Sequence, residues 1–217
     1  MVLINDKPII WHLMNIFSLQ GFNEFIISTG YKSEVIENWV RDNEIVDSNS
    51  NHMKIATLNT GLNTQTGGRI AEVMKTIPNE KVIATYGDGL ANISISKLLA
   101  FHDSHRKLAT VTAVRPPARF GYMKIEQNVV THFGEKNQSD EGWINGGFFV
   151  LEPEVLNYIK SPNEPFESGA LTNLAKTSQL MAYQHEGFWQ PMDTLREKKE
   201  LEKFATLPIP PWLQGLN

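Results

Sequence analysis

The sequence predicts an α/β protein with a mixed, mostly parallel sheet flanked by helices. Strand-like apolar runs alternate with helical periodicity up to about residue 105, which indicates βαβ units and parallel strands. Beyond that point, short strand-like runs follow one another with few helices between them. This second pattern favours a mixed or antiparallel extension of the same sheet.

Local signals set the expected elements of the first half. Pro8 suits a first helical position, and apolar residues recur behind it at helical spacing until Gly21. Ser33 can cap a second helix, whose apolar residues share one face. We expect helices over 8–20, 33–42, 69–76 and 94–104, and strands over 24–29, 53–58 and 81–84.

The second half predicts mainly strands. We expect strands over 108–114, 123–125, 129–133, 144–151 and 181–185, with helices over 153–159, 169–177 and 194–204. Residues 205–217 are rich in proline and are expected to form an extended C-terminal tail. The sequence shows no repeat and no long linker, so we expect a single domain over residues 1–217.

Composition excludes several classes of function. The 217 residues have a net charge of −4, which argues against nucleic acid or an anionic membrane as the main partner. The absence of cysteine excludes disulfides, thiolate metal sites and a cysteine nucleophile. The sequence has no signal-peptide pattern and no apolar run of the roughly 20 residues that a membrane helix needs. We therefore expect a cytoplasmic protein.

The turn Thr85-Tyr86-Gly87-Asp88-Gly89 follows the strand predicted over 81–84. Ligands of open α/β sheets bind outside the carboxyl ends of strands, and glycines beside a carboxylate allow a ligand to approach the backbone. Asp88 is therefore a candidate ligand-binding residue. A tight turn with a solvated aspartate is the alternative interpretation.

Other stretches could also bind a ligand. Thr66-Gly67-Gly68-Arg69 opens a helix, where main-chain N–H groups favour anions, although paired glycines are common in loops. Glu135 could accept hydrogen bonds from sugar hydroxyls and Lys136 could neutralise a phosphate, unless the two form an exposed ion pair. Asp193 lies just before a helix and could simply cap it.

Together these stretches resemble the sugar-1-phosphate nucleotidylyltransferases, most closely their glucose-1-phosphate cytidylyltransferase branch. The resemblance extends from Met1 into the last helix. It is carried by Asp6-Lys7-Pro8-Ile9-Ile10-Trp11-His12, Thr66-Gly67-Gly68-Arg69, Thr85-Tyr86-Gly87-Asp88-Gly89, Arg119-Phe120-Gly121, Asn145-Gly146-Gly147-Phe148-Phe149 and Gly187-Phe188-Trp189-Gln190-Pro191-Met192-Asp193-Thr194-Leu195-Arg196.

The resemblance implies a Rossmann-like core and synthesis of CDP-glucose and pyrophosphate from CTP and glucose 1-phosphate with Mg²⁺. Such sugar nucleotides serve cell-surface polysaccharides such as the lipopolysaccharide O-antigen, and the resemblance also implies a homo-oligomer. Asp88 and Asp193 match the metal-binding aspartates, and Lys136 matches the catalytic lysine on the sugar phosphate. The remaining matches are Thr64, Gly68, Arg69 and Gly87 in the nucleotide pocket and Gly121, Glu135 and Asn145 near the sugar.

The family pattern also contains a first strand and a glycine-rich loop of the GG-x-GTRL type, then a Lys-Pro-Lys-Pro stretch, which would precede Met1. That first strand should lie between the strands over 24–29 and 81–84. The chain as written is therefore expected to be unstable or inactive until such a segment is restored.

The sequence also allows other functions. The chain could use another nucleotide or sugar phosphate, or it could be a non-catalytic subunit that keeps the fold. A metal-dependent glycosyltransferase is disfavoured because Asp88-Gly89-Leu90 is not an Asp-x-Asp pair.

Overall fold

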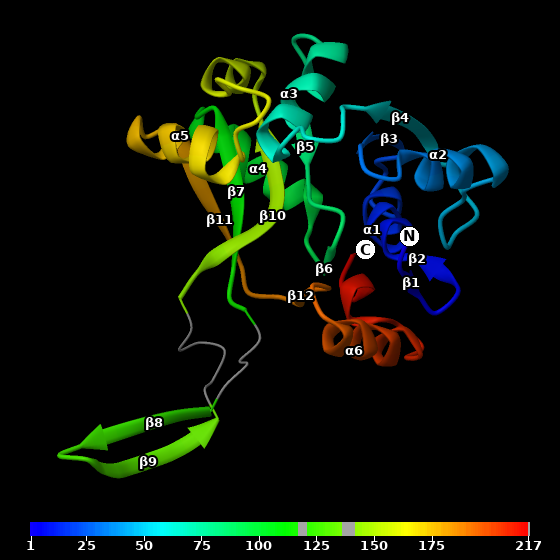
Figure 1. The fold of residues 1–217 in the computed structure, drawn as a ribbon. Helices are drawn as coiled ribbons and strands as arrows, with labels where there is room; N and C mark the ends of the chain where they lie inside the picture. Colours follow the sequence, from blue (N-terminus) through cyan, green and yellow to red (C-terminus); the bar gives the residue numbers. More distant parts are fainter. Residues whose placement is uncertain (117–120, 136–141, 217) are drawn as a thin grey trace.

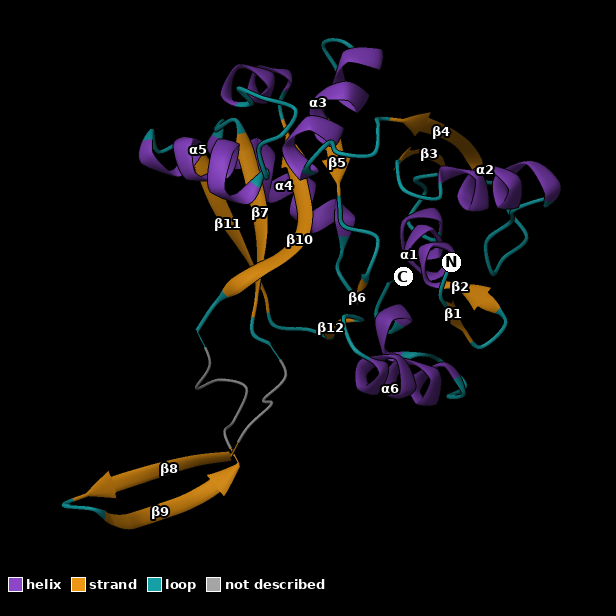
Figure 2. Ribbon diagram, viewed as in Figure 1, coloured by secondary structure: helices purple, strands orange, loops and turns teal. Residues whose placement is uncertain are grey.

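The computed structural model describes residues 1–116, 121–135 and 142–216. Its largest sheet has the strand order β11–β7–β10–β5 and lies between helices (Figure 1; Figure 2). These strands are β5 (Val82–Ala84), β7 (Ala109–Val114), β10 (Ile144–Leu151) and β11 (Leu180–His185). Because β11 runs parallel to β7 while β10 runs antiparallel to β5 and β7, the sheet is mixed. The predicted α/β class is confirmed.

A second, two-stranded sheet is parallel, as the first half of the sequence predicts. It pairs β3 (Glu24–Thr29) with β4 (Lys54–Asn59), and helix α2 (Ser33–Asp42) connects them. The small pairs are β1 (Leu3–Ile4) with β2 (Lys7–Pro8), β6 (Gly89–Ala91) with β12 (Trp189–Pro191), and β8 (Gly121–Glu126) with β9 (Val129–Glu135). The other helices are α1 (Ile9–Ser18), α3 (Thr66–Thr76), α4 (Ile95–His105), α5 (Thr172–Lys176), α6 (Leu195–Ala205), the 3₁₀ helices η2 (Pro153–Tyr158) and η4 (Pro211–Leu213), and the π-helical turn η3 (Glu167–Leu171).

Strand β10 supplies the core on both faces of the main sheet. Successive side chains of a strand point to opposite faces. Phe148 belongs to a buried cluster with residues of α1, α4 and α6, and Phe149 belongs to a second cluster with residues of α3 and α5. The sheet therefore has a hydrophobic core on each side, which explains why β10 is apolar along most of its length.

The ends of the chain join the first of these cores. Ile4 of the β1–β2 pair and Trp212 of η4 are both fully buried in it. The sequence predicts the last residues as an extended tail, whereas η4 forms a short helix that places an indole in the core. Helix α3 begins at Thr66, ahead of the predicted start at Arg69.

Strands β3 and β5 border two cavities of about 380 and 760 Å³. The smaller is lined by Ile26 and Ile27 of β3 together with Thr85 after β5, and the larger by Phe25 of β3 together with Val82 of β5. In the part of the chain that the structure describes, β3 pairs with β4 and β5 pairs with β10. The facing edges of β3 and β5 are therefore available for a further strand.

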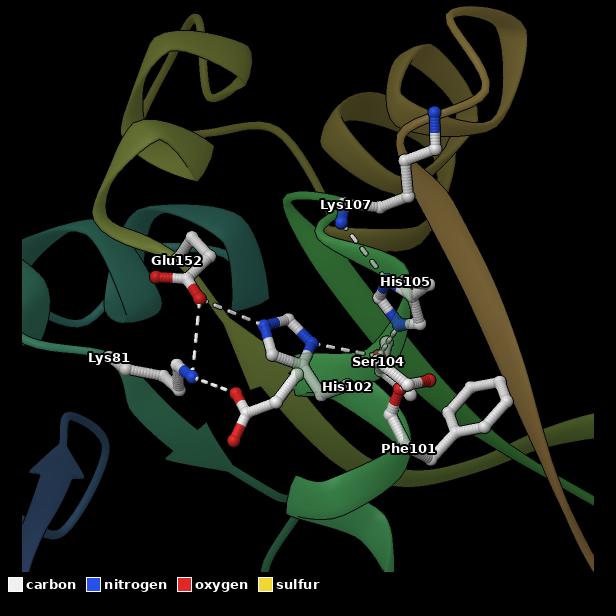
Figure 3. Close-up of polar contacts among 9 residues, drawn as sticks. Lys81, Phe101, His102, Ser104, His105, Lys107 and Glu152 are labelled. Atoms are coloured by element: carbon white, nitrogen blue, oxygen red, sulfur yellow. Dashed lines mark hydrogen bonds and ion pairs between the residues drawn. The ribbon is translucent and has the colours of Figure 1, made fainter.

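A histidine network lies where α4 ends, β7 begins and β10 ends (Figure 3); His102 and Thr110 in it are buried, and His105 and Glu152 are half-buried. The Lys107 amide donates to His105 Nδ1 at 3.0 Å, so the proton of a neutral His105 is on Nε2, which contacts Thr110 Oγ1 at 2.8 Å. The Thr110 hydroxyl can then donate to His102 Nδ1 at 2.8 Å, and His102 Nε2 to Glu152 at 3.0 Å. One consistent set of proton positions therefore satisfies every nitrogen of both rings.

Candidate active site

A short antiparallel ladder brings the two predicted metal ligands together. Strand β6 follows Asp88 and β12 precedes Asp193, with Gly89 opposite Pro191 in the register. Beyond the ladder, the Met192 N–H donates to the Asp88 carbonyl oxygen at 2.8 Å. Burial, and then the negative charge of Asp193, raise the pKa of Asp88. The charge of Asp193 therefore acts on the Asp88 carboxyl beyond the end of the ladder.

These carboxylates line a cavity of about 810 Å³ at the carboxyl end of β5. Its walls come from α3, the turn after β5, β10 and the region around β12. Five of the residues predicted from the sequence line this cavity: Arg69, Gly87, Asp88, Asn145 and Asp193. The structure therefore gathers predicted nucleotide, metal and sugar contacts around one space, while their individual roles remain predictions.

The donor set of the aspartate pair suits a hard cation such as Mg²⁺. Mg²⁺ takes oxygen ligands and is often held by one or two carboxylates together with substrate phosphates. The described residues contain no group of three or more His, Cys, Asp or Glu side chains placed to hold a metal by themselves. Burial is the larger cause of the raised pKa of Asp88 and the charge of Asp193 the smaller, and a cation between the two carboxylates would offset the second.

Arg69 is held by oxygen atoms of the protein. Its Nη1 donates to the carbonyl oxygen of Thr29 and to Thr60 Oγ1, each at 2.7 Å, and its Nη2 donates to the Gly61 carbonyl oxygen at 3.3 Å. These bonds fix the loop after β4 to the end of β3. Since a guanidinium has five N–H donors, Arg69 keeps donors for a ligand in the cavity.

Thr64 and Gly68 lie close to other parts of the protein. The Thr64 hydroxyl donates to the Thr60 carbonyl oxygen within the same loop. A Cβ atom at Gly68 would lie 2.4 Å from the carbonyl oxygen of Pro162 and 2.7 Å from its Cα. Because Gly68 has no side chain, the backbone at Pro162 can pack directly against it.

Three predicted sugar-phosphate contacts fall on or beside the β8–β9 hairpin. Gly121 is the first residue of β8 and Glu135 the last residue of β9, and the two are paired in the register of the hairpin. Lys136 lies outside the described residues. The roles of all three remain predictions.

A hydrogen-bonded chain beside the cavity was not predicted from the sequence. Glu167 accepts from the hydroxyl of Tyr86 and, at 3.0 Å, from the hydroxyl of Thr66. Asn145 Nδ2 donates to Tyr86 Oη at 3.3 Å, and Asn145 Oδ1 accepts from the Gly147 amide at 2.9 Å. Burial, and then the hydrogen bond to Glu167, raise the pKa of Tyr86. Glu167 lies in no recognisable motif, so its contacts with Thr66 and Tyr86 are visible only in the folded chain.

The chain is similar to known proteins over nearly its whole length. The nucleotidyl transferase family matches residues 1–194. A glucose-1-phosphate cytidylyltransferase of Salmonella typhi is 39% identical, covering 98% of this chain and 89% of that protein. A probable glucose-1-phosphate cytidylyltransferase of Bacillus subtilis is also 39% identical, covering 99% and 88%.

Solved structures show the same fold. HddC from Yersinia pseudotuberculosis complexed with GMP-PN has a TM-score of 0.69 at 23% identity, covering 94% of this chain and 88% of that one. UDP-glucose pyrophosphorylase complexed with UDP-glucose has a TM-score of 0.67 at 18% identity, with the same coverage. At these identities the likeness concerns the fold alone. The family match and the sequence relatives together establish that this chain belongs to the nucleotidyl transferase family.

Proposed function

We propose that this protein transfers a cytidylyl group from CTP to glucose 1-phosphate, forming CDP-glucose and pyrophosphate. The observation that carries the proposal is the convergence of Asp88 and Asp193 on one cavity at the carboxyl end of β5. The choice of substrates is supported by the two relatives at 39% identity, both of which bear the name of this activity.

The reaction joins two anions. A phosphate oxygen of glucose 1-phosphate attacks the α-phosphorus of CTP, and the bond from that phosphorus to the oxygen of the β-phosphate breaks. The electron pair of the broken bond leaves with pyrophosphate. A phosphate monoester has a second pKa of about 6, so the nucleophile is mostly dianionic at neutral pH and no general base is required. Catalysis therefore consists of aligning the reactants and neutralising their charge.

The aspartate pair fits a role in charge neutralisation. Asp88 and Asp193 would hold Mg²⁺ together with phosphate oxygens of CTP. When bound, Mg²⁺ would offset the negative charges that make the two substrates repel each other. The main-chain ladder next to the aspartates would keep the carboxylates in place before the nucleotide arrives.

The other predicted contacts divide between the two substrates. Thr64, Gly68, Arg69 and Gly87 would border the nucleotide, with Arg69 offering its remaining N–H donors. Gly121, Glu135 and Asn145 would contact the sugar, and Lys136 would place one positive charge on its phosphate.

We also propose that the reaction takes place in the cytoplasm and that the product serves cell-surface polysaccharide synthesis, such as that of the O-antigen. The absence of cysteine from the chain fits a reducing compartment. Among the described residues, no helix is long and apolar enough to cross a membrane. A homo-oligomer is proposed on the family resemblance.

The test is pyrophosphate release with CTP, GTP, UTP, dTTP or ATP, each combined with glucose 1-phosphate or mannose 1-phosphate. We expect turnover to be fastest with CTP and glucose 1-phosphate and to be abolished by EDTA. Faster turnover with another pair would reassign the substrates. The assay is run on the 217-residue chain and on a variant with a strand–GG-x-GTRL–Lys-Pro-Lys-Pro segment ahead of Met1, and the absence of turnover with every pair in both proteins would overturn the proposal.

A further inference from the structure

The segment before η3 crosses the start of helix α3. The Gln65 N–H donates to the carbonyl oxygen of Pro162 at 2.9 Å, and the Phe166 N–H donates to Thr66 Oγ1 at 2.8 Å. Gly67 has no room for a side chain here, because a Cβ atom would lie 2.7 Å from the carbonyl oxygen of Glu164. The segment over 162–167 is therefore fixed to the end of α3 that borders the cavity.

Glu167 ends this segment and connects two walls of the cavity. One carboxylate oxygen accepts from Thr66, the first residue of α3, and the other accepts from Tyr86 in the turn that carries Asp88. Phe166 next to it is fully buried, and its ring meets that of Phe149 edge to face at 5.5 Å. Because Phe166 is fixed in the core, the backbone next to it holds Glu167 in place beside Tyr86.

Tyr86 is constrained from several sides. Its ring meets that of Phe149 edge to face at 5.6 Å, its hydroxyl group donates to Glu167, and its hydroxyl oxygen accepts from Asn145 Nδ2. The left-handed backbone at Gly147, with φ of +76°, brings β10 close to the ring, since a Cβ there would lie 3.3 Å from Tyr86 Cδ2. A shift of Glu167 would therefore move Tyr86 and, through Tyr86, both Asn145 and the turn before Asp88.

We propose that Glu167 is a positioning residue of this active site, acting through Tyr86 on the turn that carries Asp88 and on Asn145. The inference rests on the proposed function for its kinetic consequence. Glu167 need not contact a substrate in this role. Its hydrogen bonds would keep the start of α3, the turn after β5 and the side chain of Asn145 in one arrangement, which the alignment of two anionic substrates requires.

The kinetic test compares Glu167→Ala, Glu167→Gln, Tyr86→Phe and the double variant E167A/Y86F, with Glu154→Gln as the matched control. Glu154 is also an exposed glutamate in a short helical turn, and it has no contact with the cavity. We expect E167A and Y86F each to lower kcat about tenfold, which is less than the roughly 10²-fold that a misplacement of about 1 Å can cost. The double variant should lose no more than the worse single variant, because both substitutions break the same bond.

The Gln variant separates positioning from folding. Its amide oxygen still accepts from the Tyr86 hydroxyl, so E167Q should recover most of the kcat that E167A loses. A residue needed only for folding would lower the amount of active enzyme, which active-site titration detects, and leave kcat per site unchanged. A kcat of E167A within twofold of the wild type, or losses that multiply in the double variant, would overturn the inference. If E167A does not fold, E167Q and Y86F still provide this comparison.

A second readout does not depend on turnover. Amide hydrogen exchange by NMR follows Gly147, whose N–H donates to Asn145 Oδ1, and Met192, whose N–H donates to the Asp88 carbonyl oxygen. E167A and Y86F should raise both exchange rates severalfold, and Glu154→Gln should leave them unchanged. Unchanged rates in E167A and Y86F would overturn the positioning role even in an enzyme with other substrates. Raised exchange in both variants, combined with no turnover by the parent protein either as the 217-residue chain or with a strand–GG-x-GTRL–Lys-Pro-Lys-Pro segment ahead of Met1, would overturn the proposed function alone.

Discussion

Asp88 and Asp193, far apart in the sequence, are coupled because the strands next to them form one antiparallel ladder. The Met192 N–H donates to the Asp88 carbonyl oxygen, so the hydrogen-bonded contact reaches the residue immediately before Asp193. The backbone thus holds the carboxylates near each other, while their mutual repulsion disfavours that arrangement in the absence of a cation. Removing one of the two charges should therefore relieve the repulsion between these side chains.

Replacing Asp88 with Asn should lower the activity of the protein without lowering its stability. The amide keeps the shape of the side chain and removes one of the two repelling charges, so the thermal unfolding midpoint should be equal to or above that of the wild type. The Mg²⁺-dependent kcat should fall about 10²-fold or more, because a ligand for the charge-neutralising cation is lost. Calorimetry and pyrophosphate release provide the two measurements. A lower midpoint combined with an unchanged kcat would contradict the assignment.

Replacing Gly68 with Ala should destabilise the start of α3. The new methyl group would meet backbone atoms of Pro162 at 2.4 and 2.7 Å, which cannot move as a flexible side chain could. We expect a loss of about 1–3 kcal/mol in the free energy of unfolding, as is usual for overpacking. Gly142→Ala is the control, since nothing lies within 4 Å of a Cβ there. Equal stability of both variants in urea would show that the segment at Pro162 is not firmly packed.

Replacing Thr110 with Val should break the histidine network shown in Figure 3. Valine has nearly the shape of threonine but leaves His102 Nδ1 and His105 Nε2 without their partner. His102 is buried, and a buried polar group without a partner costs about 1–3 kcal/mol, whereas the half-buried His105 should add less. The unfolding free energy should therefore fall by about 1–3 kcal/mol. Thr76→Val, which removes one local bond on an exposed turn of α3, should cost far less. Similar losses in the two variants would mean that the network adds little to stability.

Asp47 should make the chain sensitive to acid. Burial opposes its ionisation, but hydrogen bonds from Asn51, Ser18 and the Asn49 amide outweigh burial and hold the pKa of Asp47 below its usual value. Because the folded-state pKa is depressed, the stabilisation is present above the unfolded value of about 3.8 and is lost as pH falls through the folded value. The free energy of unfolding of Asp47→Asn, measured from pH 3 to 7, should therefore depend less on pH at the acid end. Parallel pH curves for the wild type and the variant would rule this contribution out.

The facing edges of β3 and β5 should accept one more strand. A variant with a strand–GG-x-GTRL–Lys-Pro-Lys-Pro segment ahead of Met1 should gain stability and turnover, because main-chain groups on both edges would find partners. The control carries the same segment with proline at alternate strand positions, which cannot donate to a ladder. If the two variants were equally stable and active, strand pairing would not be the cause.

Periodicity and local signals place most elements correctly from the sequence. The strands over 24–29 and 144–151 have the predicted boundaries. The cap of α6 is Thr194, in a capping box with Glu197, and not Asp193, which the sequence offered as a cap. The β6–β12 ladder could not be predicted, because strands of three residues show no periodicity. Asp88 and Asp193 were each identified as candidates, yet the reason they meet lies in that ladder.

Contacts between distant segments explain the other differences. The glycine pair before Arg69 predicts that some other group packs closely against the start of the helix. The sequence does not show that this group is the backbone of the segment at Pro162. Glu167 gave no signal because its partners, Thr66 and Tyr86, belong to different elements. Such a residue becomes recognisable only when the fold brings its partners into hydrogen-bonding distance.

The most direct test of the central claim follows the phosphate of glucose 1-phosphate through the reaction. With ¹⁸O in the three non-bridging phosphate oxygens, CTP and Mg²⁺, mass spectrometry of the products should find all three labels in CDP-glucose and none in pyrophosphate. The Asp193→Asn variant should form this product at a rate at least about 10²-fold lower. Label appearing in inorganic phosphate would mean that the bond between the sugar and its phosphate breaks, and would contradict nucleotidyl transfer at the Asp88–Asp193 site.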